Sequence, residues 1–157
     1  MIRKYLWIAA AVLVLDQLTK VAAADYFVHQ MEVRLAPFLS LVLVHNTGAA
    51  FGFLSSASGW QNIFFIIVAL IASVVILWMT SRLDAGESLI AIGLMLVLGG
   101  AVGNVIDRFV HGYVIDFVDI HYQTWHWPAF NVADSAITIG AVLLLMDALG
   151  FRKSRTS

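Results

Sequence analysis

The stretch Gly103–Ile120, GNVIDRFVHGYVIDFVDI, ends a long apolar run and then places three aspartates among aromatic and β-branched residues. These acids are Asp107, Asp116 and Asp119. Asp116 has apolar neighbours on both sides, which is a costly setting for an ionised carboxylate unless it is paired or has a function. A surface loop does not normally surround an acid with Val, Ile and Phe. The stretch therefore predicts both the end of a membrane span and the start of a reactive region.

The composition of the whole chain is that of a membrane protein. Of its 157 residues, 61% are hydrophobic and 12% are charged, whereas soluble domains carry about 25% charged residues. The mean hydropathy is +0.90. A net charge of -1 without a long basic run gives no reason to expect nucleic-acid binding. The chain has no cysteine, which excludes disulfides, thiolate metal sites and a cysteine nucleophile.

Four apolar stretches predict four transmembrane helices, at residues 5–24, 63–79, 89–106 and 130–151. Because a span needs about 20 apolar residues, four spans account for most of a single domain of residues 1–157. Basic residues lie before the first stretch, between the second and third, and after the fourth. The positive-inside rule then places both termini in the cytoplasm. The two longer connections, 25–62 and 107–129, lie on the extracytoplasmic side.

The first span has a second interpretation, because its basic start, apolar core and alanine triplet at 22–24 imitate a cleavable signal peptide. Asp16, Gln17 and Lys20 make the segment after the apolar core long and charged, which disfavours cleavage. We therefore expect the span to be retained. Asp16 and Lys20 have the i,i+4 spacing and polarity of a helical ion pair. An unpaired charge inside a span would be costly, so we expect these two side chains to neutralise each other.

The first extracytoplasmic connection contains Glu32–Val44, EVRLAPFLSLVLV, which alternates and is rich in Val and Leu. The pattern predicts one or two short strands at the membrane surface; the alternative is an interfacial loop. The predicted fold class is an all-α integral membrane protein with a small β-like platform between its first and second helices. Gly99, Gly100 and Gly103 supply a face of small residues for close helix packing.

Asp134 lies near the start of the fourth span, in FNVADSAI at residues 130–137. A structural explanation is available, since Asn131 with an acid three residues later is a capping box. If the segment with Asp116 leads back to this helix, the two carboxylates can meet at the outer edge of the bundle. Two carboxylates in contact do not both ionise. A water between them could be deprotonated by one while the other protonates a carbonyl oxygen, as amide hydrolysis requires.

Five motifs follow one another along the chain: DQLTK at 16–20, NTGAAF at 46–51, GNVIDR at 103–108, VIDF at 114–117 and FNVAD at 130–134. Together and in this order, they resemble the motifs of the lipoprotein signal peptidases, also called signal peptidase II, over essentially the whole chain. The resemblance implies a bacterial inner-membrane aspartic peptidase that removes the signal peptide from prolipoproteins, cutting before a cysteine that carries diacylglycerol. It also implies that Asp116 and Asp134 are the catalytic pair and that the first span is uncleaved.

Other polar residues receive less specific roles. We expect Asp107 to form an ion pair with Arg108 that fixes the end of the third helix, and Asp119 to be a solvated interfacial acid. His121 and His126 are five residues apart among aromatic residues, a spacing that does not suit a metal site, so we expect no metal and no cofactor. Four groups flank the proposed site and either hold an extended substrate backbone or satisfy loop carbonyls: Asn46, Asn104, Arg108 and Asn131.

Two other functions were weighed against the peptidase. A serine–lysine dyad is disfavoured because Lys20 has no serine at a suggestive position. An ion path would need polar residues across the depth of the bilayer, whereas the second and third spans contain nothing ionisable and the acids gather at one face. We therefore expect an enzyme that acts as a monomer, in contact with membrane lipid, on prolipoproteins.

Overall fold

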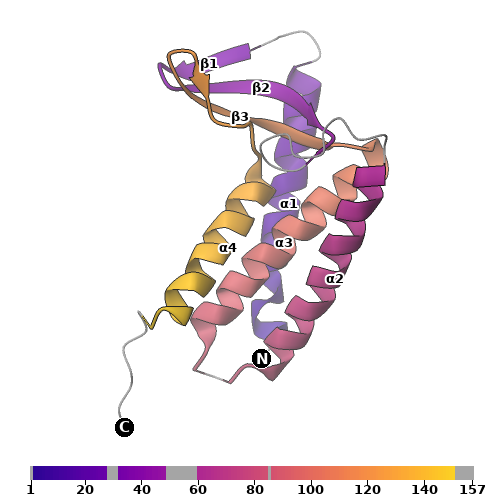
Figure 1. Cartoon of the computed structure of the whole chain (residues 1–157), viewed down its shortest axis with the longest axis vertical. Coiled ribbons are helices and arrows are strands. Elements are labelled where there is room, and N and C mark those ends of the chain that lie inside the picture. Colours follow the sequence, from indigo (N-terminus) through magenta and orange to yellow (C-terminus); the bar gives the residue numbers. More distant parts are fainter. Residues whose placement is uncertain (1, 28–31, 49–59, 85, 151–157) are drawn as a thin grey trace.

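The computed structural model describes residues 2–27, 32–48, 60–84 and 86–150. Within these ranges, four helices form a bundle and a four-stranded antiparallel sheet crosses one end of it (Figure 1). Helix α1 begins and helix α4 ends at the opposite end of the bundle (Figure 1). The helices are α1 (Ile2–Tyr26), α2 (Trp60–Arg82), α3 (Ser88–His111) and α4 (Val132–Ala148). The strands are β1 (Glu32–Ala36), β2 (Leu39–Asn46), β3 (Val114–Tyr122) and β4 (Trp125–His126).

The first three predicted spans lie within α1, α2 and α3, and the fourth overlaps α4. By length and composition, three described helices could cross a membrane, at residues 3–26, 60–82 and 88–111. Helix α4 has 17 residues and rises about 26 Å; residue 151, the predicted end of the fourth span, lies outside the described residues. Helix α3 continues past residue 106 to His111. Asp107 and Arg108 are therefore helical residues, whereas the sequence placed them in the following connection.

Helix α3 contacts each of the other three helices and lies between them (Figure 1). Its glycines allow two neighbours to come close. A Cβ on Gly99 would lie 2.7 Å from the carbonyl oxygen of Ala9 in α1, and a Cβ on Gly100 would overlap the carbonyl oxygen of Ala133 in α4. The predicted face of small residues is thus confirmed, because larger side chains would force these helices apart.

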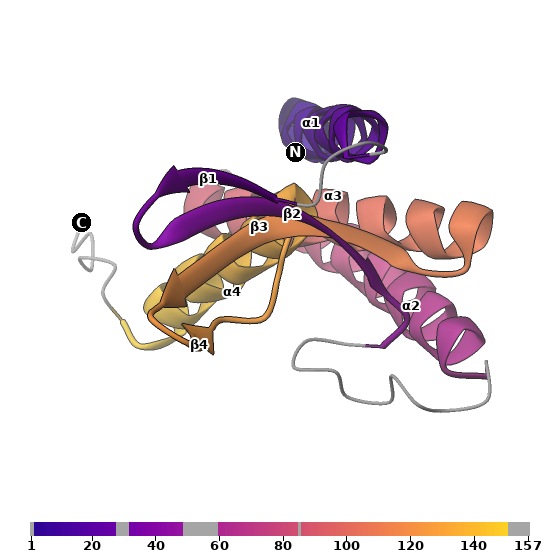
Figure 2. The ribbon, with the colours of Figure 1, turned by 90° about the horizontal axis from the view of Figure 1, so that it is seen from above.

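The sheet is larger than the sequence predicted. Strands β1 and β2 confirm the predicted platform between the first two helices. The connection after α3 adds β3, which pairs antiparallel with β2, and β4, which pairs with β3. Gly112 makes the turn from α3 into β3 with a φ of 81°, a backbone conformation that glycine adopts without strain. Figure 2 shows the strands passing over the end of the helix bundle.

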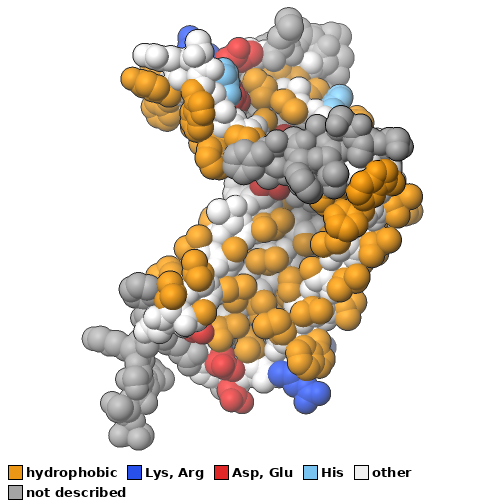
Figure 3. Space-filling model, in the orientation of Figure 1, with side chains coloured by type: hydrophobic (Ala, Val, Ile, Leu, Met, Phe, Trp, Pro, Cys, Tyr) orange, Lys and Arg blue, Asp and Glu red, His pale blue; other side chains and the backbone are white. Residues whose placement is uncertain are grey.

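The outward faces of the bundle are apolar. Figure 3 shows hydrophobic side chains covering the visible surface of the helices, with charged groups near the two ends. On α2, Ile71, Val74 and Trp78 are each at least 60% exposed. A soluble protein rarely exposes apolar patches of this extent, so these faces suit the hydrocarbon of a membrane.

The seam between α3 and α4 gives a test of this packing. Gly100→Ala would place a methyl group against the Ala133 carbonyl oxygen and 2.8 Å from Ile137. Because a backbone carbonyl cannot move aside, we expect the free energy of unfolding to fall by about 1–3 kcal/mol, measured by thermal unfolding in detergent. Ala10→Val, on an exposed face of α1, is the control and should change little. An unchanged free energy of unfolding for Gly100→Ala would contradict close packing between α3 and α4.

Candidate active site

Asp116 lies in the middle of the sheet and is 1% exposed. Strand β3 holds it opposite Val44 of β2. Both of its carboxylate oxygens accept hydrogen bonds from side-chain amides: Asn46 Nδ2 donates to Oδ2 at 2.9 Å, and Asn131 Nδ2 donates to Oδ1 at 2.7 Å. The amide of Asn46 has a fixed orientation because its own oxygen accepts the N–H of Gly48 at 3.0 Å.

The surroundings of Asp116 favour its protonated form. Burial raises the pKa of this carboxyl from its ordinary value of 3.8 to about 7, and the negative charge of Asp134 acts in the same direction. The hydrogen bonds from Asn46 and Asn131 and the charge of Lys20 oppose the rise in the pKa without cancelling it. Asp116 can therefore carry a proton at neutral pH, as a general acid in amide hydrolysis must.

Asp134 occupies the third position of α4 and is bound to the residue that caps this helix. Asn131 Oδ1 accepts the N–H of Asp134 at 2.9 Å, and the N–H of Asn131 donates to Asp134 Oδ2 at 3.3 Å, so the predicted capping box is present. Asn104 Nδ2 donates to Asp134 Oδ1 at 2.8 Å. Since the side chain of Asn131 also donates to Asp116, Asn131 connects the two acids. The sequence prediction that β3 leads back to the start of the fourth helix holds in the structure.

Arg108 lies beside this pair and is held by the main chain. Its guanidinium donates to the carbonyl oxygens of Gly48 at 2.9 Å and Asn104 at 3.3 Å. The guanidinium also lies 5.0 Å from the centre of the Phe65 ring. Among the described residues, its buried Nε has no hydrogen-bond partner. Arg108 does not form the ion pair with Asp107 that the sequence suggested. The rest of the motif that begins at Asn46, residues 49–51, lies outside the described residues.

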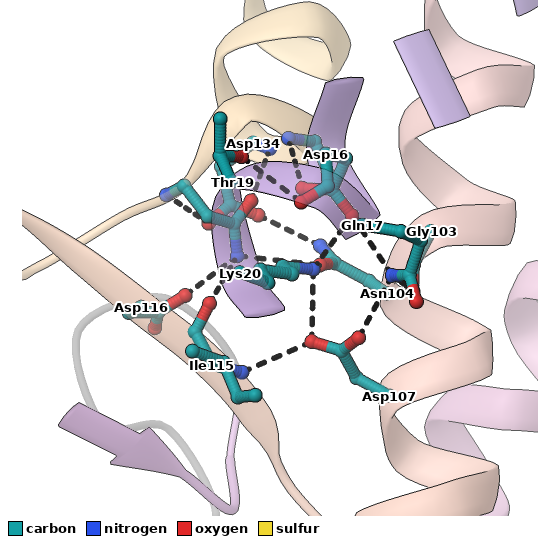
Figure 4. Close-up of polar contacts among 12 residues, drawn as sticks. Asp16, Gln17, Thr19, Lys20, Gly103, Asn104, Asp107, Ile115, Asp116 and Asp134 are labelled. Atoms are coloured by element: carbon teal, nitrogen blue, oxygen red, sulfur yellow. Dashed lines mark hydrogen bonds and ion pairs between the residues drawn. The ribbon is translucent and has the colours of Figure 1, made fainter. Parts of the chain in front are cut away.

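Asp107 instead pairs with Lys20. Lys20 Nζ lies 2.9 Å from Asp107 and 2.8 Å from Asp16, and it donates to Asn104 Oδ1 at 2.9 Å (Figure 4). The predicted Asp16–Lys20 pair is confirmed, whereas the predicted partner of Asp107 was wrong. The local spacing of Asp107 and Arg108 was misleading, because adjacent helical residues point in different directions. Sequence reasoning gave no role to Gln17, whose amide donates to Asp107 at 2.9 Å; its polarity inside a span was the available signal.

The prediction that Asp119 is a solvated interfacial acid was wrong. Asp119 is 8% exposed, and His126 Nδ1 lies 2.9 Å from Asp119 Oδ2. Because β3 pairs with β4, His126 lies opposite His121 and close enough to contact Asp119. His121 is also buried and contacts Ser40 Oγ at 3.2 Å. Within the described residues, no three His, Asp or Glu side chains are grouped so as to hold a metal ion.

A cavity of about 750 Å³ opens between the sheet and the helices, within the size range of ligand pockets. Asn46, Asn104, Arg108 and Asp134 form part of its polar wall. Asn131 is fully buried and Asp116 nearly so; neither is part of that wall. The space-filling view shows the molecule hollowed between the sheet and the bundle (Figure 3). Much of the remaining wall is apolar: Val114, Ile120, Trp125, Trp127, Phe130, Ile137 and Ile139.

Comparison with known proteins assigns a family. The family model for signal peptidase (SPase) II matches residues 8–150. The chain belongs to the signal peptidase II family. The lipoprotein signal peptidase of Janthinobacterium sp. (strain Marseille) is 50% identical over 145 residues, which cover 92% of this chain and 87% of that protein. The lipoprotein signal peptidase of Alteromonas mediterranea is 47% identical over 144 residues, covering 92% and 79%.

Two solved structures have the same fold as this chain. A bacterial membrane enzyme determined by the in meso method at 2.3 Å resolution superposes with a TM-score of 0.85 at 30% identity. The alignment covers 98% of this chain and 94% of that chain. A second such structure, at 1.9 Å resolution, gives a TM-score of 0.80 at 31% identity, covering 94% and 93%. This member of the signal peptidase II family therefore shares the fold of these two bacterial membrane enzymes.

The raised pKa of Asp116 predicts how the stability of this signal peptidase II family member depends on pH. Between the ordinary pKa of 3.8 and about 7, folded Asp116 holds a proton that the unfolded chain has released. The contribution of this carboxyl to stability is therefore lost as pH rises through that window. In thermal unfolding series across it, Asp116→Asn should flatten the decline, whereas Asp25→Asn, which removes an exposed carboxylate, should not. Equal pH dependence in wild type and Asp116→Asn would contradict the raised pKa.

Proposed function

We propose that this chain is a membrane aspartic endopeptidase that removes signal peptides from diacylglyceryl-modified prolipoproteins. Cleavage occurs before the lipidated cysteine, by a water molecule that Asp116 and Asp134 activate. Membership of the signal peptidase II family supports the removal of signal peptides from lipoproteins. The catalytic assignment rests on one observation, which is that Asn131 contacts both acids. Its side-chain nitrogen donates to Asp116, its side-chain oxygen accepts the N–H of Asp134, and its main-chain N–H donates to the Asp134 carboxylate.

The different environments of the two acids suggest different roles. Asp116 is buried in the sheet, where its raised pKa favours the acid form. Asp134 lines the cavity, where a water molecule can reach it, and its oxygens accept hydrogen bonds from the amide of Asn104 and the main-chain N–H of Asn131. We therefore assign the proton to Asp116 and the role of base to Asp134. This division resembles that of the aspartic-protease pairs, in which two carboxyls share one proton.

The proposed hydrolysis has two steps. Asp134 takes a proton from water as the water oxygen bonds to the scissile carbonyl carbon, and Asp116 gives its proton to the carbonyl oxygen. The tetrahedral intermediate then collapses: Asp134 returns its proton to the leaving nitrogen, the carbon–nitrogen bond breaks, and Asp116 recovers a proton from the hydroxyl group. The products are a signal peptide with a new carboxyl group and a lipoprotein with a free amino group on its cysteine.

The cavity suggests how the substrate is held. Arg108 lines it, so its guanidinium can bind a substrate carbonyl. Asn46 and Asn104 also line the cavity, and their amides bond the two catalytic acids. We propose that these groups hold the extended substrate backbone, with Asn131 supporting them from the interior. The apolar wall suits the lipid and the signal helix.

The charge distribution supports a topology in the bacterial inner membrane. Arg3 and Lys4 start α1 and Arg82 ends α2, at the end of the bundle opposite the sheet (Figure 1). By the positive-inside rule that end faces the cytoplasm. We propose four spans, with α4 as the fourth, both termini in the cytoplasm, and the active site at the extracytoplasmic surface. The enzyme acts there as a monomer in contact with lipid.

Removal of either catalytic carboxyl tests the assignment. Asp116→Asn and Asp134→Asn keep the side-chain volume but cannot exchange the proton, so kcat should fall by about 10²- to 10⁴-fold. The measurement is cleavage of a purified diacylglyceryl-modified precursor, followed by release of its signal peptide on gels. Asp119→Asn is the matched control, since it alters a buried acid on the same strand. Near wild-type turnover by either catalytic variant would refute the pair.

The dependence on lipid tests the substrate class. A peptide bond reaches Asp116 and Asp134 only if it is held at their depth, and diacylglycerol anchors the cysteine by about 0.8 kcal/mol per buried methylene. We expect the same precursor without its lipid to be cleaved poorly or not at all. Both forms should be compared in one detergent at one enzyme concentration. Equal rates would point to a general membrane peptidase instead.

A further inference from the structure

Two carboxylates outside the proposed catalytic pair bind the main chain directly beside it. Asp107 Oδ2 accepts the N–H of Ile115, the residue before Asp116, at 3.0 Å. Asp16 Oδ1 accepts the N–H of Ala133, the residue before the other catalytic acid, at 2.9 Å. Asp16 comes from α1 and Asp107 from α3. Two helices thus each fix the backbone next to one member of the pair.

Lys20 joins these two anchors. Its Nζ lies 2.8 Å from Asp16 Oδ2 and 2.9 Å from Asp107 Oδ2. Its third hydrogen bond, to Asn104 Oδ1 at 2.9 Å, leaves the amide nitrogen of Asn104 to donate to Asp134 at 2.8 Å. If the Asn104 amide were turned over, its oxygen would face Asp134 and its nitrogen would face Lys20, and both hydrogen bonds would be lost. The ammonium group therefore reaches the catalytic pair by two routes, through backbone amides and through the orientation of Asn104 (Figure 4).

The cluster is closed and fully hydrogen-bonded. The side chains of Lys20, Asp16 and Asp107 are at most 2% exposed. Gln17 Nε2 donates to Asp107 Oδ1 at 2.9 Å and to Asp16 Oδ2 at 3.3 Å, so all four carboxylate oxygens have partners. A Cβ on Gly103 would lie 2.5 Å from Asp16 Oδ2. The absence of a side chain at Gly103 is therefore what admits the carboxylate.

Stability alone does not account for such a cluster. Replacing a buried ion cluster by apolar side chains of similar volume is often neutral or stabilising. What apolar side chains cannot do is accept the N–H groups of Ile115 and Ala133 in fixed positions. The directional contacts, and not the charges as such, distinguish this cluster from an apolar core.

We propose that Asp16, Lys20 and Asp107 are positioning residues that set the separation of the two catalytic carboxylates. The inference rests on the proposed function, because that separation matters only if the pair reacts together. None of the three touches the substrate in this proposal. They act through the backbone of β3 and α4 and through the amide of Asn104.

Isosteric substitutions separate positioning from simple stabilisation. Asp107→Asn keeps an oxygen for the N–H of Ile115 and leaves Lys20 paired with Asp16, whereas Asp107→Leu has a similar volume and no acceptor. On the lipidated precursor, we expect Asp107→Leu to lower kcat by about 10²-fold with KM within about threefold. Asp107→Asn should recover most of that loss. Asp16→Asn and Asp16→Leu test the other anchor in the same way.

Matched controls come from β3, the strand that carries Asp116. Asp119→Asn and Asp119→Leu alter a buried acid whose partner is His126, and the two variants should have similar kcat.

If Asp107→Leu does not fold, the α-hydroxy analogue of isoleucine at position 115 removes only the N–H that Asp107 accepts. It should lower kcat without raising KM. Circular dichroism and thermal unfolding establish that each variant compared is folded.

The outcomes are distinguishable. Folded Asp107→Leu and Asp16→Leu with kcat within about threefold of wild type would overturn the positioning role. Equal losses in the asparagine and leucine variants, or losses confined to KM, would also overturn it. Wild-type protein that does not cleave the precursor would overturn the proposed function and this inference with it. Active wild type, inactive Asp116→Asn and unaffected leucine variants would overturn this inference alone.

Discussion

A buried ammonium group between two carboxylates joins the elements that surround the proposed active site. Lys20 lies inside the helix bundle, where an unpaired charge would be expensive. Asp16 and Asp107 neutralise it, and each also accepts a backbone N–H from a further element, β3 or α4. In the low dielectric of the interior, leaving any of these groups without its partners would be costly in free energy. Two helices, a strand and the start of a third helix must therefore come together at one point.

This constraint explains why the polar residues of so apolar a chain gather at one end. The outer faces of the bundle carry apolar side chains (Figure 3). Helix α3 packs against its neighbours through glycines. Above the cluster, the sheet holds Asp116 in a hydrogen-bonded ladder, which positions a side chain more rigidly than a loop would. Asn131 then connects that strand to the first turn of α4. In the proposed reaction, the same arrangement that satisfies buried polar groups places an acid beside a base.

Sequence reasoning reached the parts of this arrangement that depend on local spacing. The helices follow from apolar runs, the Asp16–Lys20 pair from its i,i+4 spacing, and the contact of Asn131 with Asp134 from the capping-box pattern. It missed β3, because the first half of that strand is covered on both faces and the second half buries its polar residues, Asp119 and His121, instead of its apolar ones. The partners of Asp107 and Asp119 were also missed. The first comes from another helix, and the second depends on a hairpin that only pairing of β3 with β4 reveals.

In the proposed mechanism, Asp116 and Asp134 activate water without a covalent bond between enzyme and substrate. Single-turnover cleavage of the lipidated precursor in ¹⁸O-labelled water, with enzyme in excess, distinguishes this mechanism from attack by an aspartate. We expect one ¹⁸O atom in the new carboxyl group of the released signal peptide and none in the enzyme, as measured by mass spectrometry. An unlabelled signal peptide, with the label on the side chain of Asp116 or Asp134, would show that an aspartate attacks the carbonyl and would exclude direct attack by water.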